Sequence, residues 1–318
     1  MPRVALIGTG GTIQSSDDRR LSLEEVMADI RTLHPASLPL GVELDASELL
    51  SAGAETFGPE EWRVIGRAVQ AAADRPNVDG VVLTHGTFTA EETAYLLHLT
   101  IRTSKPVVLA VSQRKHGTIG NDGDRNLADA IRVAATPAAG GQGVLVVVSD
   151  EIHSARDVVK EHQHLTGFRS NHGTLGSIES DQVTIYRQVL RRHTDASPFR
   201  LDSLERIPRV DIVAAYPGAD AAAIEAVVAA GAEGLVMAGY AYSGVANPIQ
   251  MEALRNAADG GVVVVLASRG REGRIPDAGR EWAVRADNLT PQKARILLGL
   301  AMTETRTPAA IQHLFDTL

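Results

Sequence analysis

Two glycine-containing segments each place a threonine hydroxyl directly after a strongly apolar run. GTGGTI at 8–13 follows the first run of the chain and carries Thr12, and THGTFTAEET at 84–93 follows a later run and carries Thr87. Glycine lets a ligand approach the backbone closely, and open α/β sheets bind ligands at the carboxyl ends of their strands. Each hydroxyl is therefore a candidate for chemistry on a bound molecule.

Both segments also allow structural interpretations. The first could be a tight turn capped by its threonine, but it is neither a dinucleotide fingerprint, which requires glycine where Ile13 stands, nor a P-loop, because no GK[ST] follows. In the second, Thr89 and Glu92 have the spacing of a capping box and predict a helix over 90–100. Thr87 then lies just before a helix N-terminus, where backbone N–H groups can stabilise an oxyanion.

Lys160 is the candidate general base. It ends the sequence DVVK, away from any obvious solvated face. Burial beside Thr87 would lower its pKa and let the neutral amine accept a proton; an ordinary surface lysine is the alternative.

His85 is interpreted as a turn or packing residue. His162 and His164 have a spacing that suits zinc only on a strand or loop, and no third ligand is placed, so we predict neither a metal nor a cofactor.

Short apolar runs alternate with helical patterns along the chain, which predicts an α/β fold with right-handed crossovers. The runs are continuous rather than alternating, as in parallel strands covered on both faces. They lie at 4–8, 80–84, 106–111, 143–149, 210–215, 234–238 and 261–267. Helices are predicted from Gly58 onward, over 221–230 and over 291–301.

The chain of 318 residues predicts two domains. The stretch 188–209 is charged, contains two prolines and lacks a long apolar run. We therefore predict an N-terminal domain over 1–190, a linker over 191–209 and a C-terminal domain over 210–318.

Composition excludes several classes of function. The chain has 31 Lys and Arg against 39 Asp and Glu, a net charge of −8, which argues against nucleic-acid binding. No apolar run approaches the roughly 20 residues of a membrane span, and the absence of cysteine excludes disulfides and thiol nucleophiles. The N-terminus enters a strand-like run without a signal peptide, so with Met1 as the native start we expect a cytoplasmic protein.

The chain resembles the bacterial-type L-asparaginase/glutaminase amidohydrolases over essentially its whole length. TGGTI at 9–13 and the pattern GxxxTHGTxTxEETA at 80–94 carry the resemblance, and 289–298 is similar to the last long helix of the family. The resemblance implies a larger N-terminal domain with a flavodoxin-like parallel sheet and a smaller C-terminal α/β domain. It also implies a small-molecule amide substrate and a homodimer or homotetramer with active sites at the dimer interface.

The resemblance also assigns roles to the candidate residues. Thr12 matches the threonine that forms the acyl-enzyme, and Thr87 and Lys160 match a second catalytic pair, with Gly86 in the same motif. Such a set suits amide hydrolysis, which requires a hydroxyl nucleophile, a base and donors to the oxyanion.

Three polar residues that accompany the catalytic residues in the family are replaced by apolar residues in this chain. Phe88 replaces the aspartate that binds the substrate ammonium, Leu21 corresponds to the mobile-loop tyrosine, and Ala54 corresponds to the serine that holds the substrate carboxylate. Glu55 retains a polar position that could contact an amine or N–H, and Asn247 matches an asparagine that lines the site.

Burying a charged group without a partner costs several kcal/mol. We therefore expect a less polar amide, lactam or cyclic imide as the substrate rather than asparagine. An ordinary asparaginase or glutaminase whose Glu55 holds the amine is one alternative. A catalytically inactive small-molecule binding protein of the same fold is another.

Overall fold

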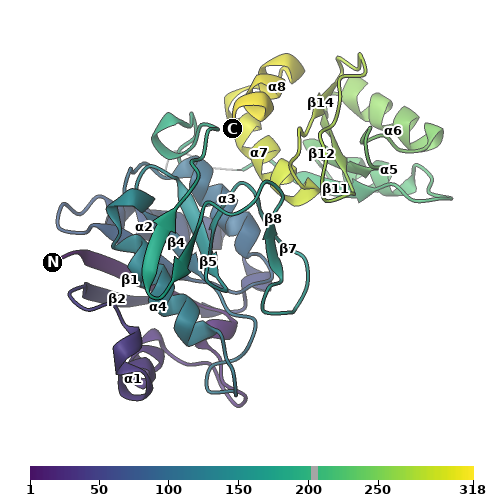
Figure 1. Cartoon of the computed structure of the whole chain (residues 1–318). Coiled ribbons are helices and arrows are strands. Elements are labelled where there is room, and N and C mark those ends of the chain that lie inside the picture. The colour runs from purple at the N-terminus through teal and green to yellow at the C-terminus, as the bar shows by residue number, and fades with distance from the viewer. Residues whose placement is uncertain (202–206) are drawn as a thin grey trace. The chain divides into compact units, whose positions relative to one another are not determined.

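The computed structural model describes residues 1–201 and 207–318, which form two compact units, Met1–Asp202 and Ser203–Leu318 (Figure 1). Of the predicted linker 191–209, residues 202–206 lie outside the described residues. The preceding part, 191–201, belongs to the N-terminal unit: the side chains of Phe199 and Leu201 are buried, and Ser197 Oγ donates to the carbonyl of Leu99 at 2.5 Å.

An eight-stranded sheet forms the centre of the N-terminal unit, in the order β10-β9-β6-β5-β4-β3-β1-β2. Its first five strands in the sequence are parallel to one another, whereas β6, β9 and β10 pair antiparallel. The strands are β1 (Arg3–Gly10), β2 (Glu43–Ala52), β3 (Gly80–Thr84), β4 (Val107–Ala110), β5 (Val144–Val148), β6 (Glu151–Ser154), β9 (Gly176–Glu179) and β10 (Gln182–Ile185). A separate antiparallel pair consists of β7 (Val158–Lys160) and β8 (Phe168–Ser170).

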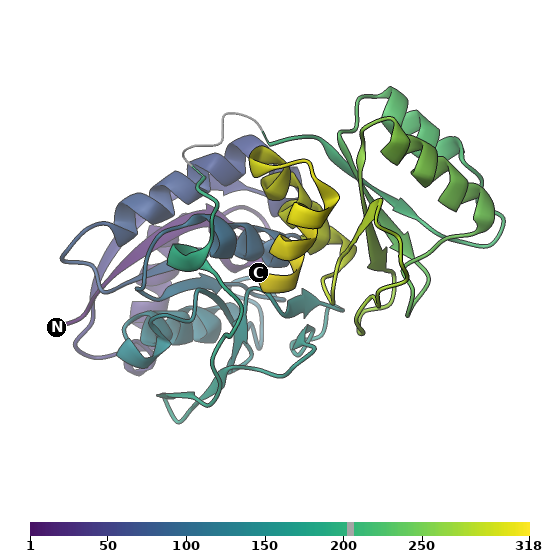
Figure 2. The same ribbon diagram turned by 90° about the horizontal axis from the view of Figure 1, so that it is seen from above.

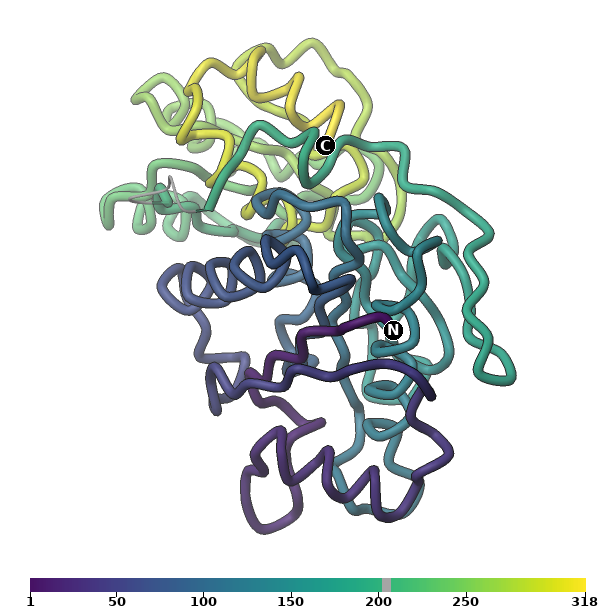
Figure 3. The backbone as a smooth tube through the Cα atoms, turned by 90° about the vertical axis from the view of Figure 1, so that its left-hand side faces the viewer, coloured from purple at the N-terminus to yellow at the C-terminus, as the bar shows by residue number. Residues whose placement is uncertain are grey.

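Helices cover both faces of this sheet, and their path can be followed in Figure 3. Because side chains alternate along a strand, Val4 and Leu6 of β1 pack with α1 (Leu23–Leu33) and α4 (Gly123–Ala134). Ala5 and Ile7 pack on the other face with α2 (Pro59–Ala73) and α3 (Ala90–Thr100). The apolar runs predicted from the sequence are therefore buried strands between two layers of helices.

The strand order fixes where a ligand site can form. From the edge inward the order is β2-β1-β3-β4-β5. This is the flavodoxin-like arrangement, in which successive parallel strands are added on one side of β1 and then on the other, so that the strand order reverses between β1 and β3. The crevice outside the carboxyl ends of those two strands is the expected binding position. The segments that carry Thr12 and Thr87 leave the sheet there, directly after β1 and β3.

The C-terminal unit is a smaller three-layer α/β structure, and the mixed α/β fold class predicted from the sequence is confirmed. Four parallel strands lie in chain order: β11 (Val210–Ala214), β12 (Gly234–Gly239), β13 (Val263–Ser268) and β14 (Ala283–Arg285). Within this unit, α5 (Ala222–Ala229) and α6 (Pro248–Asp259) lie on one face of the sheet, and α7 (Pro291–Glu304) and α8 (Pro308–Thr317) lie on the other (Figure 2).

All seven predicted strands are present, as are the predicted helices α2, α3, α5 and α7. The strand β2 was not predicted, because it is an edge strand whose residues are largely exposed and alternate irregularly between polar and apolar types. Within the described residues, no helix combines the length and the apolar character that a bilayer crossing requires.

Candidate active site

The loop after β1 presents Thr12 as the first residue of a short 3-10 turn, Thr12–Gln14. Gly10 and Gly11 reach this turn with φ values of 90° and 88°, a region that favours glycine. The buried side chain of Gln14 stabilises the turn by joining it to the ends of β1 and β3. Its Oε1 accepts from the backbone N–H of Gly10 at 3.0 Å and from the hydroxyl of Thr84 at 2.5 Å. The half-buried Thr12 hydroxyl makes no hydrogen bond within the described residues.

Backbone contact between two glycines brings the β1 and β3 loops together. A Cβ atom built on Gly11 would lie 2.4 Å from the backbone nitrogen of Gly86. A Cβ atom on Gly86 would lie 2.8 Å from the Cβ of Ala54, in the loop after β2. Thr12 and Thr87 each directly follow one of the touching glycines, so the two loops that carry the predicted nucleophile and its predicted partner are in contact.

Replacing Gly11 with alanine is expected to lower the free energy of unfolding by about 3 kcal/mol, because the methyl group meets fixed backbone as well as an unfavourable φ. Gly41→Ala is the matched control, since Gly41 has a φ of 78° but no atom within 4 Å of a built Cβ. That variant should lose only about 1 kcal/mol. Urea unfolding of both variants tests the difference, and equal losses would show that the loops do not touch.

Lys160 lies beside Thr87, as predicted. Its Nζ is 2.6 Å from Thr87 Oγ1, and the Thr87 side chain is buried. Lys160 ends β7, and its backbone N–H donates to Glu91 Oε2 of α3 at 3.1 Å. Partial burial lowers the pKa of Lys160 from its ordinary value, because desolvation disfavours the charged form. The pair therefore has the geometry and the direction of pKa shift that a base requires.

Phe88, the residue after Thr87, also lies close to the Lys160 amine. Its ring centroid is 4.8 Å from Lys160 Nζ, within the range of a cation–π contact. The Phe88 side chain is 64% exposed, so its ring forms a free apolar surface next to the reactive pair.

The predicted capping box at the start of α3 is wrong. Thr89 is the N-cap residue, but its side chain makes no capping hydrogen bond. Its hydroxyl donates instead to the carbonyl of Ala54 at 3.0 Å, a partner distant in the sequence. This bond holds the β2 loop against the β3 loop, with Ala54 buried at the contact. Glu55 is exposed, and its carboxylate folds back over Gly53.

Two other predicted substrate-binding residues have structural contacts. The Leu21 side chain is 7% exposed and belongs to the apolar cluster that contains α1. Asn247, in the C-terminal unit, is the N-cap of α6: its side chain accepts from the backbone N–H of Gln250 at 3.0 Å and donates to the carbonyl of Ala219 at 2.8 Å. Their contact with a substrate stays a prediction.

His85 is a packing residue, as interpreted from the sequence. It is fully buried, with its ring edge-on to Phe57 and its Nδ1 2.8 Å from the carbonyl oxygen of Gly86. Desolvation lowers its pKa to about 4, so the ring is neutral. His162 and His164 lie in an exposed loop. In the described part of the chain, no cluster of three metal-ligating side chains occurs.

Sequence reasoning missed the short hairpin that follows the Thr12 turn. Ser15 and Arg20 pair as an isolated bridge, and Ser16 N–H donates to the carbonyl of Arg19 at 2.9 Å. The backbone N–H of the buried His116 donates to the carbonyl of Ser15 at 2.9 Å. The hairpin over residues 15–20 is thus fixed at its base.

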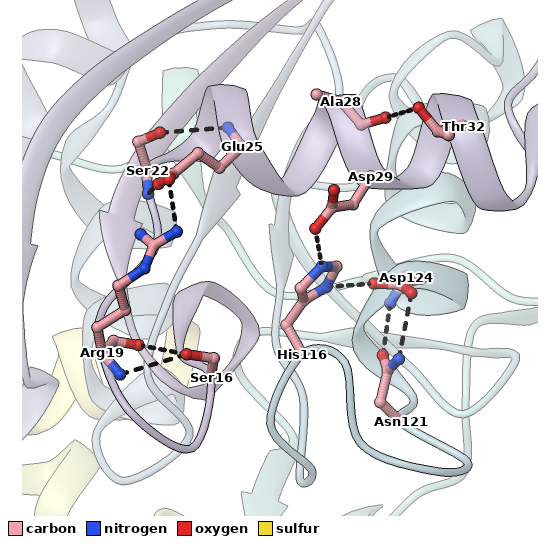
Figure 4. A network of polar contacts seen from close by, with 10 residues as sticks. All are labelled: Ser16, Arg19, Ser22, Glu25, Ala28, Asp29, Thr32, His116, Asn121 and Asp124. Atoms are coloured by element: carbon pink, nitrogen blue, oxygen red, sulfur yellow. Dashed lines mark hydrogen bonds and ion pairs between the residues drawn. The ribbon is translucent and has the colours of Figure 1, made fainter.

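The His116 ring joins this loop to two helices. Its Nδ1 lies 2.8 Å from Asp124 Oδ1 of α4, and its Nε2 lies 3.1 Å from Asp29 Oδ2 of α1 (Figure 4). Ser22 and Glu25 form a capping box at the start of α1. The S-x-x-E spacing of these two residues was visible in the sequence, whereas the contacts of His116 depend on the loop paths and carried no local signal.

Comparison with known protein families shows which family this chain belongs to. The Asparaginase, N-terminal family matches residues 3–191, and the Glutaminase/Asparaginase C-terminal domain family matches residues 209–315. The chain belongs to the asparaginase family of amidohydrolases. The resemblance stated from the two threonine motifs is confirmed, and this asparaginase-family protein is a hydrolase of carbon–nitrogen bonds.

Individual relatives align with nearly the entire asparaginase-family chain. A probable periplasmic L-asparaginase of Haemophilus influenzae is 34% identical over 99% of this chain and 93% of its own. L-asparaginase 2 of Escherichia coli is 32% identical, with the same coverage of both chains. The crystal structure of a probable cytoplasmic L-asparaginase from Campylobacter jejuni has a TM-score of 0.92 at 33% identity and covers 100% of each chain. These relatives include both a periplasmic and a cytoplasmic protein.

Proposed function

We propose that this protein hydrolyses a less polar amide, lactam or cyclic imide through a covalent acyl-enzyme on Thr12. Thr12 Oγ1 attacks the carbonyl carbon, and its proton passes to the Thr87–Lys160 pair. The tetrahedral intermediate then collapses, the C–N bond breaks, and the nitrogen leaves with that proton. Water hydrolyses the resulting ester, which releases the carboxylic acid and restores the Thr12 hydroxyl. Backbone N–H groups of the adjoining loops are the proposed oxyanion donors.

The contact between Lys160 and Phe88 carries the substrate proposal. The 2.6 Å contact between Lys160 and Thr87 supports a catalytic pair, while the ring 4.8 Å from the amine supplies no counter-charge to a substrate ammonium. The carboxylate of Glu91 accepts from the backbone N–H of Lys160 at 3.1 Å. An amide without an α-ammonium group therefore suits this site better than asparagine, because no charge of the substrate is left unpaired.

A panel of amides tests this proposal. We expect purified protein to release ammonia or carboxylate from butanamide, 2-pyrrolidinone or succinimide with a higher kcat/KM than from asparagine or glutamine. Phe88→Asp should raise kcat/KM for asparagine at least about tenfold, since a recovered charge–ammonium contact is worth about 1.5–3 kcal/mol. Phe88→Asn is the matched control, because it has nearly the same shape as aspartate without the charge. Efficient asparagine turnover by the unaltered protein would refute the substrate proposal.

Ordinary asparaginase activity is the second candidate, supported by the names of the relatives and by the exposed carboxylate of Glu55. Glu55→Gln would then abolish asparagine turnover. Binding of amides without any product would instead indicate the inactive binding protein.

We further propose, from family membership alone, a homodimer or homotetramer whose active sites lie at the dimer interface. A cytoplasmic location is proposed from the likeness to the probable cytoplasmic L-asparaginase of Campylobacter jejuni. Light scattering after size-exclusion chromatography measures the assembly, and a monomer that is fully active would contradict it. Fractionation of the native cells tests the location.

A further inference from the structure

Arg20 ends the hairpin that follows the Thr12 turn, and its guanidinium lies against the end of β1. Its Nη1 is 3.5 Å from the position of a Cβ built on Gly10. Gly10 pairs with Ala52 of β2, whose carbonyl oxygen is 2.7 Å from the same built Cβ. The guanidinium is therefore placed at the carboxyl ends of β1 and β2, where the chain continues to Thr12 and to Ala54.

The charges around Arg20 have other partners. Arg19 forms an ion pair with Glu25 at 2.7 Å. Glu48, farther back along β2, accepts from Gln14 Nε2 at 3.0 Å and from the Leu23 backbone N–H at 2.7 Å. Within residues 1–201 and 207–318, the Arg20 guanidinium forms neither an ion pair nor a hydrogen bond. A cation with all its donors available thus borders the loops that carry the proposed nucleophile.

We infer that Arg20 binds a carboxylate of the substrate. Guanidinium presents a planar pair of donors that matches a carboxylate, and the buried methyl group of Ala54 on the neighbouring loop offers no such donor. Because Phe88 provides no acid for an ammonium, the matching substrate carries one negative charge and no positive charge. This chemistry is that of a dicarboxylic acid monoamide without an α-amino group, such as succinamate. The inference rests on the proposed amide hydrolysis and narrows its substrate class.

A comparison of succinamate with butanamide measures the contribution of the substrate carboxylate. The two amides differ only at the end far from the amide group, where succinamate has a carboxylate and butanamide has a methyl group. We expect the unaltered protein to prefer succinamate. Arg20→Ala should lower kcat/KM for succinamate at least about tenfold, mainly through KM, while kcat/KM for butanamide stays within about twofold. Arg20→Lys should retain part of the preference. Arg19→Ala is the matched control and should change neither substrate.

Two outcomes would overturn the role of Arg20 while amide hydrolysis stands: no preference for succinamate, or equal losses on both substrates in Arg20→Ala. If the unaltered protein hydrolyses neither amide, the proposed function fails for this class. Calorimetry with succinate then tests Arg20 directly. Binding weakened at least tenfold in Arg20→Ala supports the carboxylate site, and equal binding, or none to either protein, refutes it.

Discussion

Thr12→Val is expected to lower kcat by at least about 1,000-fold on any amide that the unaltered protein hydrolyses, because the variant keeps the shape of the side chain and loses the nucleophile. Thr12 lies on a turn fixed by Gln14, and the Thr12 hydroxyl makes no hydrogen bond in the described part of the chain. The fold should therefore not depend on this hydroxyl. Urea unfolding should confirm unchanged stability, and Thr12→Ser should recover part of the activity.

Mass spectrometry identifies the acylated residue directly. Thr87→Val should slow turnover by a similar factor because it breaks the 2.6 Å contact with Lys160, and any acyl group that accumulates in this variant should lie on the peptide containing Thr12. An acyl group on another residue, or a Thr12→Val protein that retains a tenth of the activity, would remove Thr12 from its proposed role.

Lys160→Met is expected to lower kcat/KM by about 100- to 10,000-fold, the usual contribution of a positioned general base. In the unaltered protein, kcat/KM should rise with pH through the pKa of Lys160, which burial lowers from the ordinary value of 10.5. This rise should be absent in Lys160→Met. Lys115→Met is the control, since Lys115 is a half-exposed lysine 3.4 Å from Asp17. The same pH profile in Lys160→Met and the unaltered protein would show that another group is the base.

The lowered pKa also gives the sign of the effect on stability. Between the folded and unfolded pKa values of Lys160, the unfolded chain binds more protons, so this group makes stability rise with pH across that window. Below the window the folded protein carries a desolvated ammonium. Lys160→Met should therefore have an unchanged or higher Tm at neutral pH, and a large fall in Tm would show that its loss of activity reflects unfolding.

Much of the fold could be predicted because its signals are local. All seven continuous apolar runs became parallel strands. The pairing of Lys160 with Thr87 had no local signal and came from the resemblance to the family. The strand β2 lacks this signal because it lies at the exposed edge of the sheet. Its residues mix polar and apolar types and do not form a continuous apolar run.

The site details that were missed depend on contacts between distant segments. Thr89 has the local spacing of a capping box, but the carbonyl of Ala54 is the partner of its hydroxyl. Leu21 directly follows Arg20, the last residue of the hairpin, yet Leu21 packs in the core while the Arg20 guanidinium lies near Gly10. No sequence pattern states which of two adjacent side chains turns inward.

The contact between Gly11 and Gly86 has a consequence for how such enzymes diversify. Main chain touching main chain sets the spacing of the two reactive loops, so that spacing does not vary with the neighbouring side chains. Under the proposed mechanism, mutation at the exposed Phe88 could therefore change which amide is bound, while the spacing across which Thr12 passes its proton to the Thr87–Lys160 pair is kept.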